Sequence, residues 1–293
     1  MGRKRKLTRE TTLLISGLTF PEGPRWHDNK LYFSDFFTHK VMSVDLAGNL
    51  ATIVELDDQP SGLGWLPDGS LMIVSMIERK LLRFSEGNLS ELADCSNLAS
   101  FHCNDMVVDV SGNAYIGNFG FDMSADQDLT ATNMILVRPG EEPCVAADEL
   151  FFPNGTVISP DAKTLIVGET YAARLTAFDI NPDATLSNRR VWADLSKIRK
   201  DYFPVPDGMC LDEEGAIWVA SPTTNEVIRV KEGGKILESI PVKSNAYACM
   251  LGGENRKTLF ICTSSGTDEE SCKEDKGGCI ETIEVDVAGF GYP

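Results

Sequence analysis

A short sequence pattern recurs six times along this 293-residue chain, and the repetition constrains the fold more than any other feature. Each copy begins with a short opening run and continues into a turn rich in Asp, Asn and Gly, followed by a β-rich segment. Such turns are typical of tight hairpins, which need residues that tolerate positive φ. The opening runs are FPEGPRW from Phe20, QPSGLGW from Gln59, HCNDMVV from His102, FPNGTVI from Phe152, VPDGMCL from Val205 and NAYACML from Asn245.

Two further β-rich segments complete each repeat, as VMSVDL and LATIVEL do in the first. Four short strands per repeat are typical of one propeller blade, so the sequence predicts an all-β, six-bladed β-propeller with four-stranded antiparallel blades. Helical periodicity is nearly absent, with only residues 193–201 able to form a turn or two, which argues against alternating strands and helices. We expect residues 18–293 to form a single propeller domain. Residues 1–17 are expected to be an N-terminal tail that contains a candidate ring-closing strand at residues 12–15.

Charge and hydropathy narrow the choice of partners. The formal net charge of -17 argues against a nucleic-acid partner, because phosphate binding needs a basic surface. No apolar run approaches the roughly 20 residues that a bilayer requires, and the apolar stretch at residues 13–20 is too short and broken for a signal peptide. We therefore expect a cytoplasmic protein with reduced cysteines and no membrane partner. Cys272 and Cys279 flank a polar loop and would pair only in an oxidising compartment.

Equivalent positions in the six repeats should converge on one axis, because the innermost strand of each blade lines the central channel. At the third position of the opening run two residues are acidic and two are amides, and burying such groups is costly unless something pairs with them. Taken singly, Pro-Glu-Gly, Pro-Asn-Gly and Pro-Asp-Gly are ordinary turn sequences, but their coincidence at one repeat position favours a site. The residues at this position are Glu22, Ser61, Asn104, Asn154, Asp207 and Tyr247.

Carboxylate and amide oxygens are ligands that hard cations prefer. The sequence therefore predicts one divalent metal ion in the channel, held by the four side chains Glu22, Asn104, Asn154 and Asp207. Oxygen ligands alone do not choose among Ca, Zn, Mn, Mg and Fe(II), because selectivity also depends on cavity size and metal availability.

The motifs PEGPRW, CNDM, PNGTVISPD and PDGMCLD together resemble those of the senescence-marker-protein and gluconolactonase family, the regucalcin-like six-bladed propellers. The resemblance extends over about residues 17–287. It implies that Glu22, Asn154 and Asp207 bind the metal, that Asn104 lines or joins the site, and that Asp207 is the residue essential for hydrolysis. It also implies a metal-dependent hydrolase that opens a sugar lactone or another small lactone.

One position departs from the pattern of the sugar-lactone members. They usually carry an arginine two residues before the asparagine that matches Asn104, and here that residue is His102. An imidazole lacks the bidentate fork of a guanidinium, which weakens the case for a polyhydroxylated substrate. A second substrate position of the family falls at Asp122, with Asn118 just before it. We therefore predict His102, Asn104, Asn118 and Asp122 as substrate-binding residues, the alternatives being a packed or capping histidine and ordinary loop structure.

Several mechanisms and functions remain open from the sequence. A divalent cation would polarise a lactone carbonyl, and either a water deprotonated by Asp207 or Asp207 itself would attack it. We favour the water route, because a metal lowers the pKa of a bound water. The alternatives are a propeller phosphotriesterase and a non-catalytic binding propeller whose metal staples the channel. An ion with open coordination positions favours an enzyme, and an ion fully enclosed by protein ligands favours the non-catalytic binding propeller.

Overall fold

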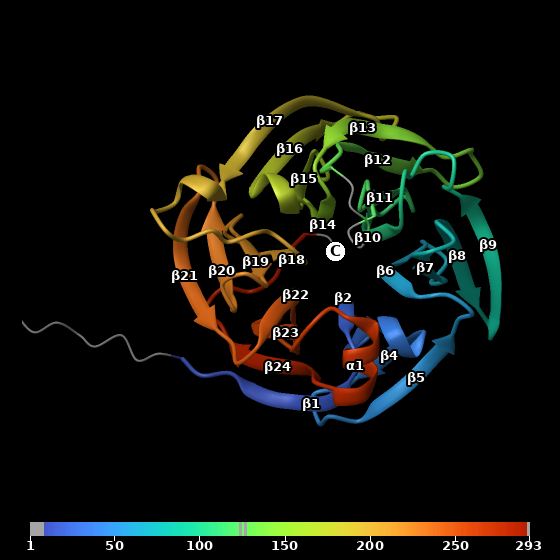
Figure 1. The fold of residues 1–293 in the computed structure, drawn as a ribbon. Coiled ribbons are helices and arrows are strands. Elements are labelled where there is room, and N and C mark those ends of the chain that lie inside the picture. The colour runs from blue at the N-terminus through green and yellow to red at the C-terminus, as the bar shows by residue number, and fades with distance from the viewer. Residues whose placement is uncertain (1–8, 123–124, 126–127, 292–293) are drawn as a thin grey trace, which may run out of the picture.

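The computed structural model describes residues 9–122, 125 and 128–291. Within these residues, 24 strands form six four-stranded antiparallel sheets arranged as blades around a central channel, which confirms the six-bladed propeller (Figure 1). In blades 1 to 5 the strands follow one another outward in chain order, so the opening run of each repeat provides or precedes the innermost strand. Residues 1–8 of the predicted N-terminal tail lie outside the described residues.

Blades 1 to 3 come from the first half of the chain. Asp109 shows why the hairpin turns between their strands carry Asp and Asn. Its carboxylate accepts hydrogen bonds from the backbone N–H groups of Ser111 and Asn113 at 2.8 and 3.0 Å, which closes the turn between the first two strands of blade 3. Blade 1 consists of β2 (Pro21–His27), β3 (Lys30–Asp35), β4 (Lys40–Val44) and β5 (Leu50–Glu55), blade 2 of β6 (Pro60–Trp65), β7 (Leu71–Ser75), β8 (Lys80–Ser85) and β9 (Asn88–Asp94), and blade 3 of β10 (Cys103–Val108), β11 (Ala114–Asn118), β12 (Thr132–Val137) and β13 (Cys144–Leu150).

Blades 4 to 6 complete the ring, and short helices interrupt some of the connections. Blade 4 consists of β14 (Pro153–Ile158), β15 (Thr164–Glu169), β16 (Arg174–Ile180) and β17 (Leu186–Asp194), blade 5 of β18 (Met209–Leu211), β19 (Ile217–Ser221), β20 (Glu226–Lys231) and β21 (Lys235–Pro241), and blade 6 of β22 (Asn245–Gly252), β23 (Thr258–Ser264), β24 (Gly278–Glu284) and β1 (Thr12–Leu18). The helices are η1 (Phe36–Thr38), η2 (Thr170–Ala172), η3 (Leu195–Lys197) and α1 (Glu269–Asp275).

The ring is closed by strands from the two ends of the chain. Strand β1 pairs antiparallel with β24, so the segment before the first opening run forms the outer edge of blade 6. Blades 1 and 6 also pack through their aromatic residues, since the indole of Trp26 stacks on the ring of Phe260 with centroids 5.3 Å apart. The strand pairing completes blade 6 with a segment from the start of the chain, and the aromatic contact packs blade 1 against blade 6, so the ring is closed.

All eight cysteines are free thiols, including Cys272 and Cys279. Cys272 is buried in α1 and Cys279 lies in β24, where each sulfur approaches a nearby backbone carbonyl oxygen, that of Gly266 at 3.4 Å and that of Gly277 at 3.5 Å. Within the described ranges, no helix combines the length and the apolar character that crossing a bilayer requires.

Candidate metal centre

The four predicted metal ligands come together in the central channel. Glu22, Asn104 and Asn154 are each the second residue of an innermost strand, on β2, β10 and β14. Asp207 lies two residues before β18 of blade 5. All four side chains are buried and line one cavity of about 200 Å³. Residues at equivalent positions of the sequence repeat therefore lie close together in the structure.

The innermost strands are irregular where the predicted ligands lie. The register of β2 with β3 shifts between Glu22 and Arg25, and that of β14 with β15 shifts between Pro153 and Thr156. A β-bulge releases a side chain from the regular alternation between the two faces of a sheet. The irregularity lets the ligand side chains turn toward the channel cavity instead of packing between blades. Comparable shifts occur in β6, β10 and β22.

The glycine that follows the ligand position is required by the packing of neighbouring blades. At Gly155 an added Cβ would lie 2.3 Å from the backbone oxygen of Asp207, and at Gly62 it would lie 2.4 Å from the backbone nitrogen of Met106. Only glycine permits backbones to approach so closely. The Pro-Asn-Gly triplet at Asn154, which resembles a turn, is therefore the start of a strand whose glycine brings adjacent blades together.

Hydrogen bonds connect the two predicted amide ligands, Asn104 and Asn154, to their surroundings. The Nδ2 group of Asn104 donates to Oδ1 of Asn154 at 3.0 Å, and Nδ2 of Asn154 donates to Oγ1 of Thr170 at 3.2 Å. The hydroxyl of Thr170 donates in turn to the carbonyl oxygen of Pro206 at 2.8 Å. Thr170 was not among the predicted site residues, and it ties Asn154 to the segment that carries Asp207.

Burial makes the two carboxyl groups of the site difficult to ionise together. Desolvation and the neighbouring charge of Asp207 raise the pKa of Glu22 well above its ordinary value. Desolvation also raises the pKa of Asp207 to about 8, although a hydrogen bond from Asn154 acts in the opposite direction. A divalent cation between the two groups would replace their repulsion by attraction and lower both pKa values.

The donor set fits a hard divalent cation. In the part of the chain that the structure describes, no group of three or more His, Cys, Asp or Glu side chains is placed to hold a metal. The cluster depends instead on two carboxylates and two amide oxygens, and hard cations take both kinds of ligand. The burial and repulsion of the two carboxylates are the features that a bound cation would relieve.

Ser61 and Tyr247 occupy the same repeat position as the four predicted ligands. The hydroxyl of Ser61 donates to Oδ1 of Asn104 at 3.3 Å, and Tyr247 lines the cavity with a pKa that burial raises above its ordinary value. Because neutral hydroxyls are weak ligands, we expect Ser61→Ala to keep the wild-type amount of bound metal, measured by elemental analysis. A Ser61→Ala protein that purifies without the ion would place Ser61 in the ligand set.

Two of the predicted substrate residues, His102 and Asp122, are not among the described residues that line the cavity. The imidazole of His102 stacks on the ring of Phe101 with centroids 3.9 Å apart, and burial lowers its pKa. Its ring centroid is 6.1 Å from that of Phe119, which does line the cavity. Asp122 is half-buried in the loop after β11. Contact with a substrate stays a prediction for both residues.

Asn118 is held by hydrogen bonds inside its own blade. Its Nδ2 group donates to the carbonyl oxygen of Asn133 and its Oδ1 accepts from the hydroxyl of Thr132, both at 2.6 Å. The side chain is fully buried, and the cavity wall is formed by other residues. These contacts favour the structural role for Asn118, and its contact with a substrate stays a prediction.

The cavity wall is mostly aromatic, which the pattern of polar residues did not reveal. A signal was present in the repeat, because an aromatic residue comes two positions before the ligand in blades 1 and 4, at Phe20 and Phe152. Two others, Phe36 and Phe119, directly follow the second strand of their blades. Besides the four predicted ligands, the described residues that line the cavity are Phe20, Phe36, Phe119, Phe152, Tyr171, Tyr247 and Thr267.

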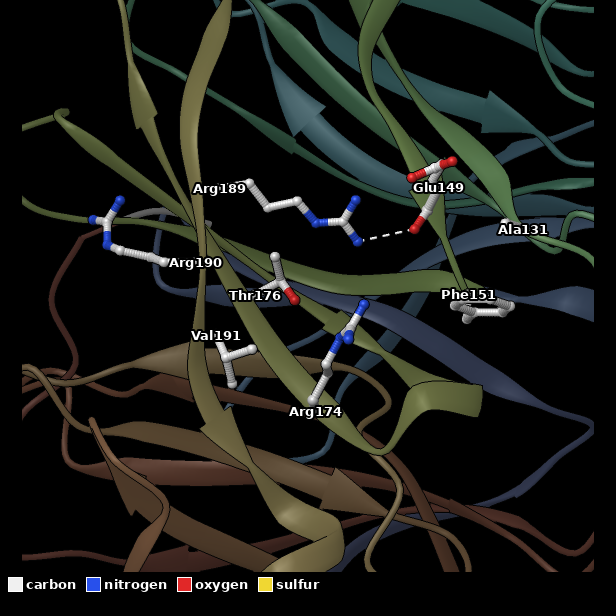
Figure 2. Close-up of a pocket in the computed structure, with 8 residues that line it drawn as sticks. All are labelled: Ala131, Glu149, Phe151, Arg174, Thr176, Arg189, Arg190 and Val191. Carbon is white, nitrogen blue, oxygen red and sulfur yellow. Dashed lines mark hydrogen bonds between the residues drawn. The ribbon is translucent and has the colours of Figure 1, made fainter.

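A larger hollow of about 570 Å³ lies where β13 of blade 3 meets β16 and β17 of blade 4, and none of the predicted ligands is among the described residues that line it (Figure 2). Its guanidinium groups already have partners. The Nε and terminal nitrogen of Arg174 donate to the buried carboxylate of Glu169 at 2.8 and 3.0 Å, and Arg189 donates to the carbonyl oxygen of Glu149 at 2.9 Å. The bonds of Arg174 join β16 to β15 inside blade 4, and the bond of Arg189 attaches β17 to β13 of blade 3, so we assign this hollow to structure.

The fold and the site define a propeller protein with an oxygen-rich polar centre in its channel. A family model described as "SMP-30/Gluconolactonase/LRE-like region" matches residues 20–265. The chain belongs to this family.

Known proteins support this assignment over nearly the whole chain. Regucalcin of Gallus gallus is 26% identical over 283 residues, which cover 93% of this chain and 93% of that protein. A calcium-binding regucalcin structure from Agrobacterium tumefaciens has a TM-score of 0.80 at 20% identity and covers 97% of this chain and 96% of its own. A gluconolactonase structure from Xanthomonas campestris has a TM-score of 0.76 at 23% identity, covering 98% and 94%. At these identities the two structures show the shared fold.

Proposed function

We propose that this protein is a metal-dependent lactonase that hydrolyses a small lactone in the central channel. The observation that carries the proposal is the convergence of Glu22, Asn104, Asn154 and Asp207 from four blades on one buried cavity. Membership of a family that includes gluconolactonases supports lactone hydrolysis. The name of the Agrobacterium relative, a calcium-binding protein, supports calcium as one candidate ion.

The reaction adds water across the ester bond of the ring. A divalent cation held by the four ligands would supply a Lewis acid for the carbonyl oxygen. We assign Asp207 as the general base. Its carboxylate takes a proton from the attacking water as the water oxygen bonds to the carbonyl carbon. The ring C–O bond then breaks, the proton passes to the leaving oxygen, and the product is an open-chain hydroxy acid. Thr170 and Asn154 keep Asp207 in place through the contacts described above.

The geometry favours an enzyme over a metal-stapled binding propeller. Four protein oxygens are fewer than the six to eight ligands that a calcium-sized ion takes, and a cavity of about 200 Å³ adjoins them. Water and a substrate carbonyl could occupy the remaining positions. A purely structural ion would instead be enclosed by protein ligands.

Hydrolysis assays on metal-loaded protein test this proposal. We expect turnover of at least one lactone among dihydrocoumarin, δ-valerolactone and glucono-δ-lactone, and no turnover of the phosphotriester paraoxon. Turnover of paraoxon alone would instead identify a phosphotriesterase. Hydrolysis of none of these compounds by protein that holds the metal would contradict the proposal and favour the staple.

The predicted role of His102 has its own test. In His102→Arg the longer side chain offers a bidentate fork to ring hydroxyls, so kcat/KM for glucono-δ-lactone relative to δ-valerolactone should rise by about tenfold. Metal content should stay at the wild-type value, because His102 is not in the predicted ligand set. An unchanged ratio would assign His102 to packing against Phe101.

A further inference from the structure

The aromatic side chains that bound the metal cavity form two groups on opposite sides of the channel. Blades 1 and 4 lie opposite each other in a ring of six, as do blades 3 and 6 (Figure 1). Two aromatic walls on opposite blades therefore line the same cavity as the predicted metal ligands. The blade 1/6 wall consists of Phe20, Phe36 and Tyr247, and the blade 3/4 wall consists of Phe119, Phe152 and Tyr171.

Contacts between rings hold each wall in place. In the blade 1/6 wall, the ring of Phe20 lies 4.6 Å from that of Tyr247 and 5.3 Å from that of Phe36. In the blade 3/4 wall, the rings of Phe119 and Phe152 are perpendicular with centroids 4.5 Å apart. These are favoured separations for aromatic pairs. The walls are therefore formed before a ligand binds, as expected of a binding pocket.

Phe152 adds an independent sign that the blade 3/4 wall serves a function. Its φ of 55° lies in the left-handed region, which large side chains rarely adopt. The residue lies two positions before the predicted ligand Asn154, and its ring lines the same cavity. Strained conformations of this kind cluster at functional sites, where the surrounding structure maintains them.

The polar groups of the cavity are few. Among the described residues that line it, only Thr267 and the hydroxyls of Tyr171 and Tyr247 add polar atoms to those of the four predicted ligands, and none is Lys, Arg or His. A polyhydroxylated lactone would bury several hydroxyls against the aromatic walls. Each buried hydroxyl without a hydrogen-bond partner weakens binding.

The size of the cavity also limits the substrate. Its volume of about 200 Å³ lies below the roughly 300 to 1,000 Å³ that is usual for pockets that take drug-sized ligands. A single ring or a compact fused pair of rings suits such a space, and the aromatic walls suit a flat, apolar one.

We propose that the substrate is a small aromatic or alkyl-substituted lactone, whose apolar ring lies between the two aromatic walls while its ester group faces the predicted metal ligands. This inference rests on the proposed function and narrows its substrate class. Specificity then comes from the walls, because the apolar part of the substrate contacts them.

The first test compares kcat/KM for dihydrocoumarin and glucono-δ-lactone on metal-loaded protein. An apolar pocket rejects a hydroxylated analogue by about a hundredfold, so we expect dihydrocoumarin to be preferred by at least that factor. Equal or better hydrolysis of glucono-δ-lactone would overturn the inference and leave the lactonase function intact.

The second test changes one wall. Asn tolerates positive φ, so Phe152→Asn can keep the backbone while it removes the ring. We expect kcat/KM for dihydrocoumarin to fall by about tenfold or more, and that for δ-valerolactone, which lacks the aromatic ring, by no more than about twofold. Phe290→Asn, at an exposed phenylalanine outside the cavity, should change neither value.

Phe119→Leu repeats the test if Phe152→Asn does not fold. Equal loss on both lactones in the variant that folds would contradict a role for the walls in specificity.

A binding measurement separates this inference from the proposed function. Dihydroquinolinone and gluconolactam are unreactive lactam analogues of the two lactones, and calorimetry gives their dissociation constants for metal-loaded protein. We expect dihydroquinolinone to bind at least about tenfold more tightly, because its ring fills the space between the walls. Tighter binding of gluconolactam would overturn the inference even if no lactone is hydrolysed. If dihydroquinolinone binds more tightly but no lactone is hydrolysed, the lactonase function alone is overturned.

Discussion

Replacement of Asp207 by asparagine is expected to lower kcat/KM for the best lactone by at least about a hundredfold. This is the usual scale for loss of a positioned acid–base group, and weaker metal binding would add to it. Asparagine keeps the shape of the side chain and one oxygen ligand, so the protein should fold and retain some metal. The measurements are kcat/KM, metal content and melting temperature on the same preparation.

Asp161→Asn is the matched control for this substitution. Asp161 also follows a proline within a blade, but its side chain is exposed in the turn before β15, where it accepts hydrogen bonds from Ser159 and Lys163. Exposed turn substitutions usually change stability by no more than about 0.5 kcal/mol, so Asp161→Asn should keep wild-type activity and metal. Near-wild-type turnover in metal-loaded Asp207→Asn would show that Asp207 has no catalytic role and that the ion is structural.

Removal of the metal is expected to have an effect at least as large. A Lewis acid contributes several kcal/mol to the stabilisation of the transition state, and about 1.4 kcal/mol corresponds to a tenfold change in rate. Incubation with a chelator followed by its removal should therefore lower lactone hydrolysis by at least a hundredfold. The melting temperature should fall as well, because a ligand that binds only the folded state stabilises it.

Titration of single metals back into the chelated protein provides the control. Calcium, zinc, manganese, magnesium and Fe(II) are added separately, and at least one should restore both the rate and the melting temperature. A chelated protein that keeps its full rate would exclude a metal-dependent reaction. Recovery of the melting temperature without recovery of the rate would favour the metal-stapled alternative.

The sequence predicted the architecture well because the repeat has a geometric consequence. Each opening run contains the start of an innermost strand, so aligning the runs by sequence also placed Glu22 and Asp207 close together in space. Helix α1 was missed, because its sequence is polar and only Cys272 is buried. The start of α1 becomes recognisable only from its N-terminal cap in the structure, where the Asp268 carboxylate accepts a hydrogen bond from the N–H of Ser271.

The site was harder to predict in full, because part of it comes from positions where no polar pattern repeats. Thr170 and Tyr171 lie in η2, after the second strand of blade 4, and neither residue type recurs at that place in the other blades. The aromatic walls likewise combine residues from several different loops. Substrate contact by Asn118 stays a prediction, and hydrogen bonds to Asn133 and Thr132 inside its own blade hold its buried side chain.

The central claim is that Glu22, Asn104, Asn154 and Asp207 hold the metal in the channel. Calorimetric titration of metal into chelated protein tests it directly, with variants of the predicted ligands measured beside the wild type. We expect the wild type to bind about one ion per chain. Both Glu22→Gln and Asn154→Ala should bind it at least about tenfold more weakly, because Gln replaces a charged carboxylate by a neutral amide and Ala removes an oxygen ligand of a hard cation. Ser61→Ala should match the wild type. Binding of the same ion with unchanged affinity in Glu22→Gln and Asn154→Ala, or no binding by the wild type, would contradict the account.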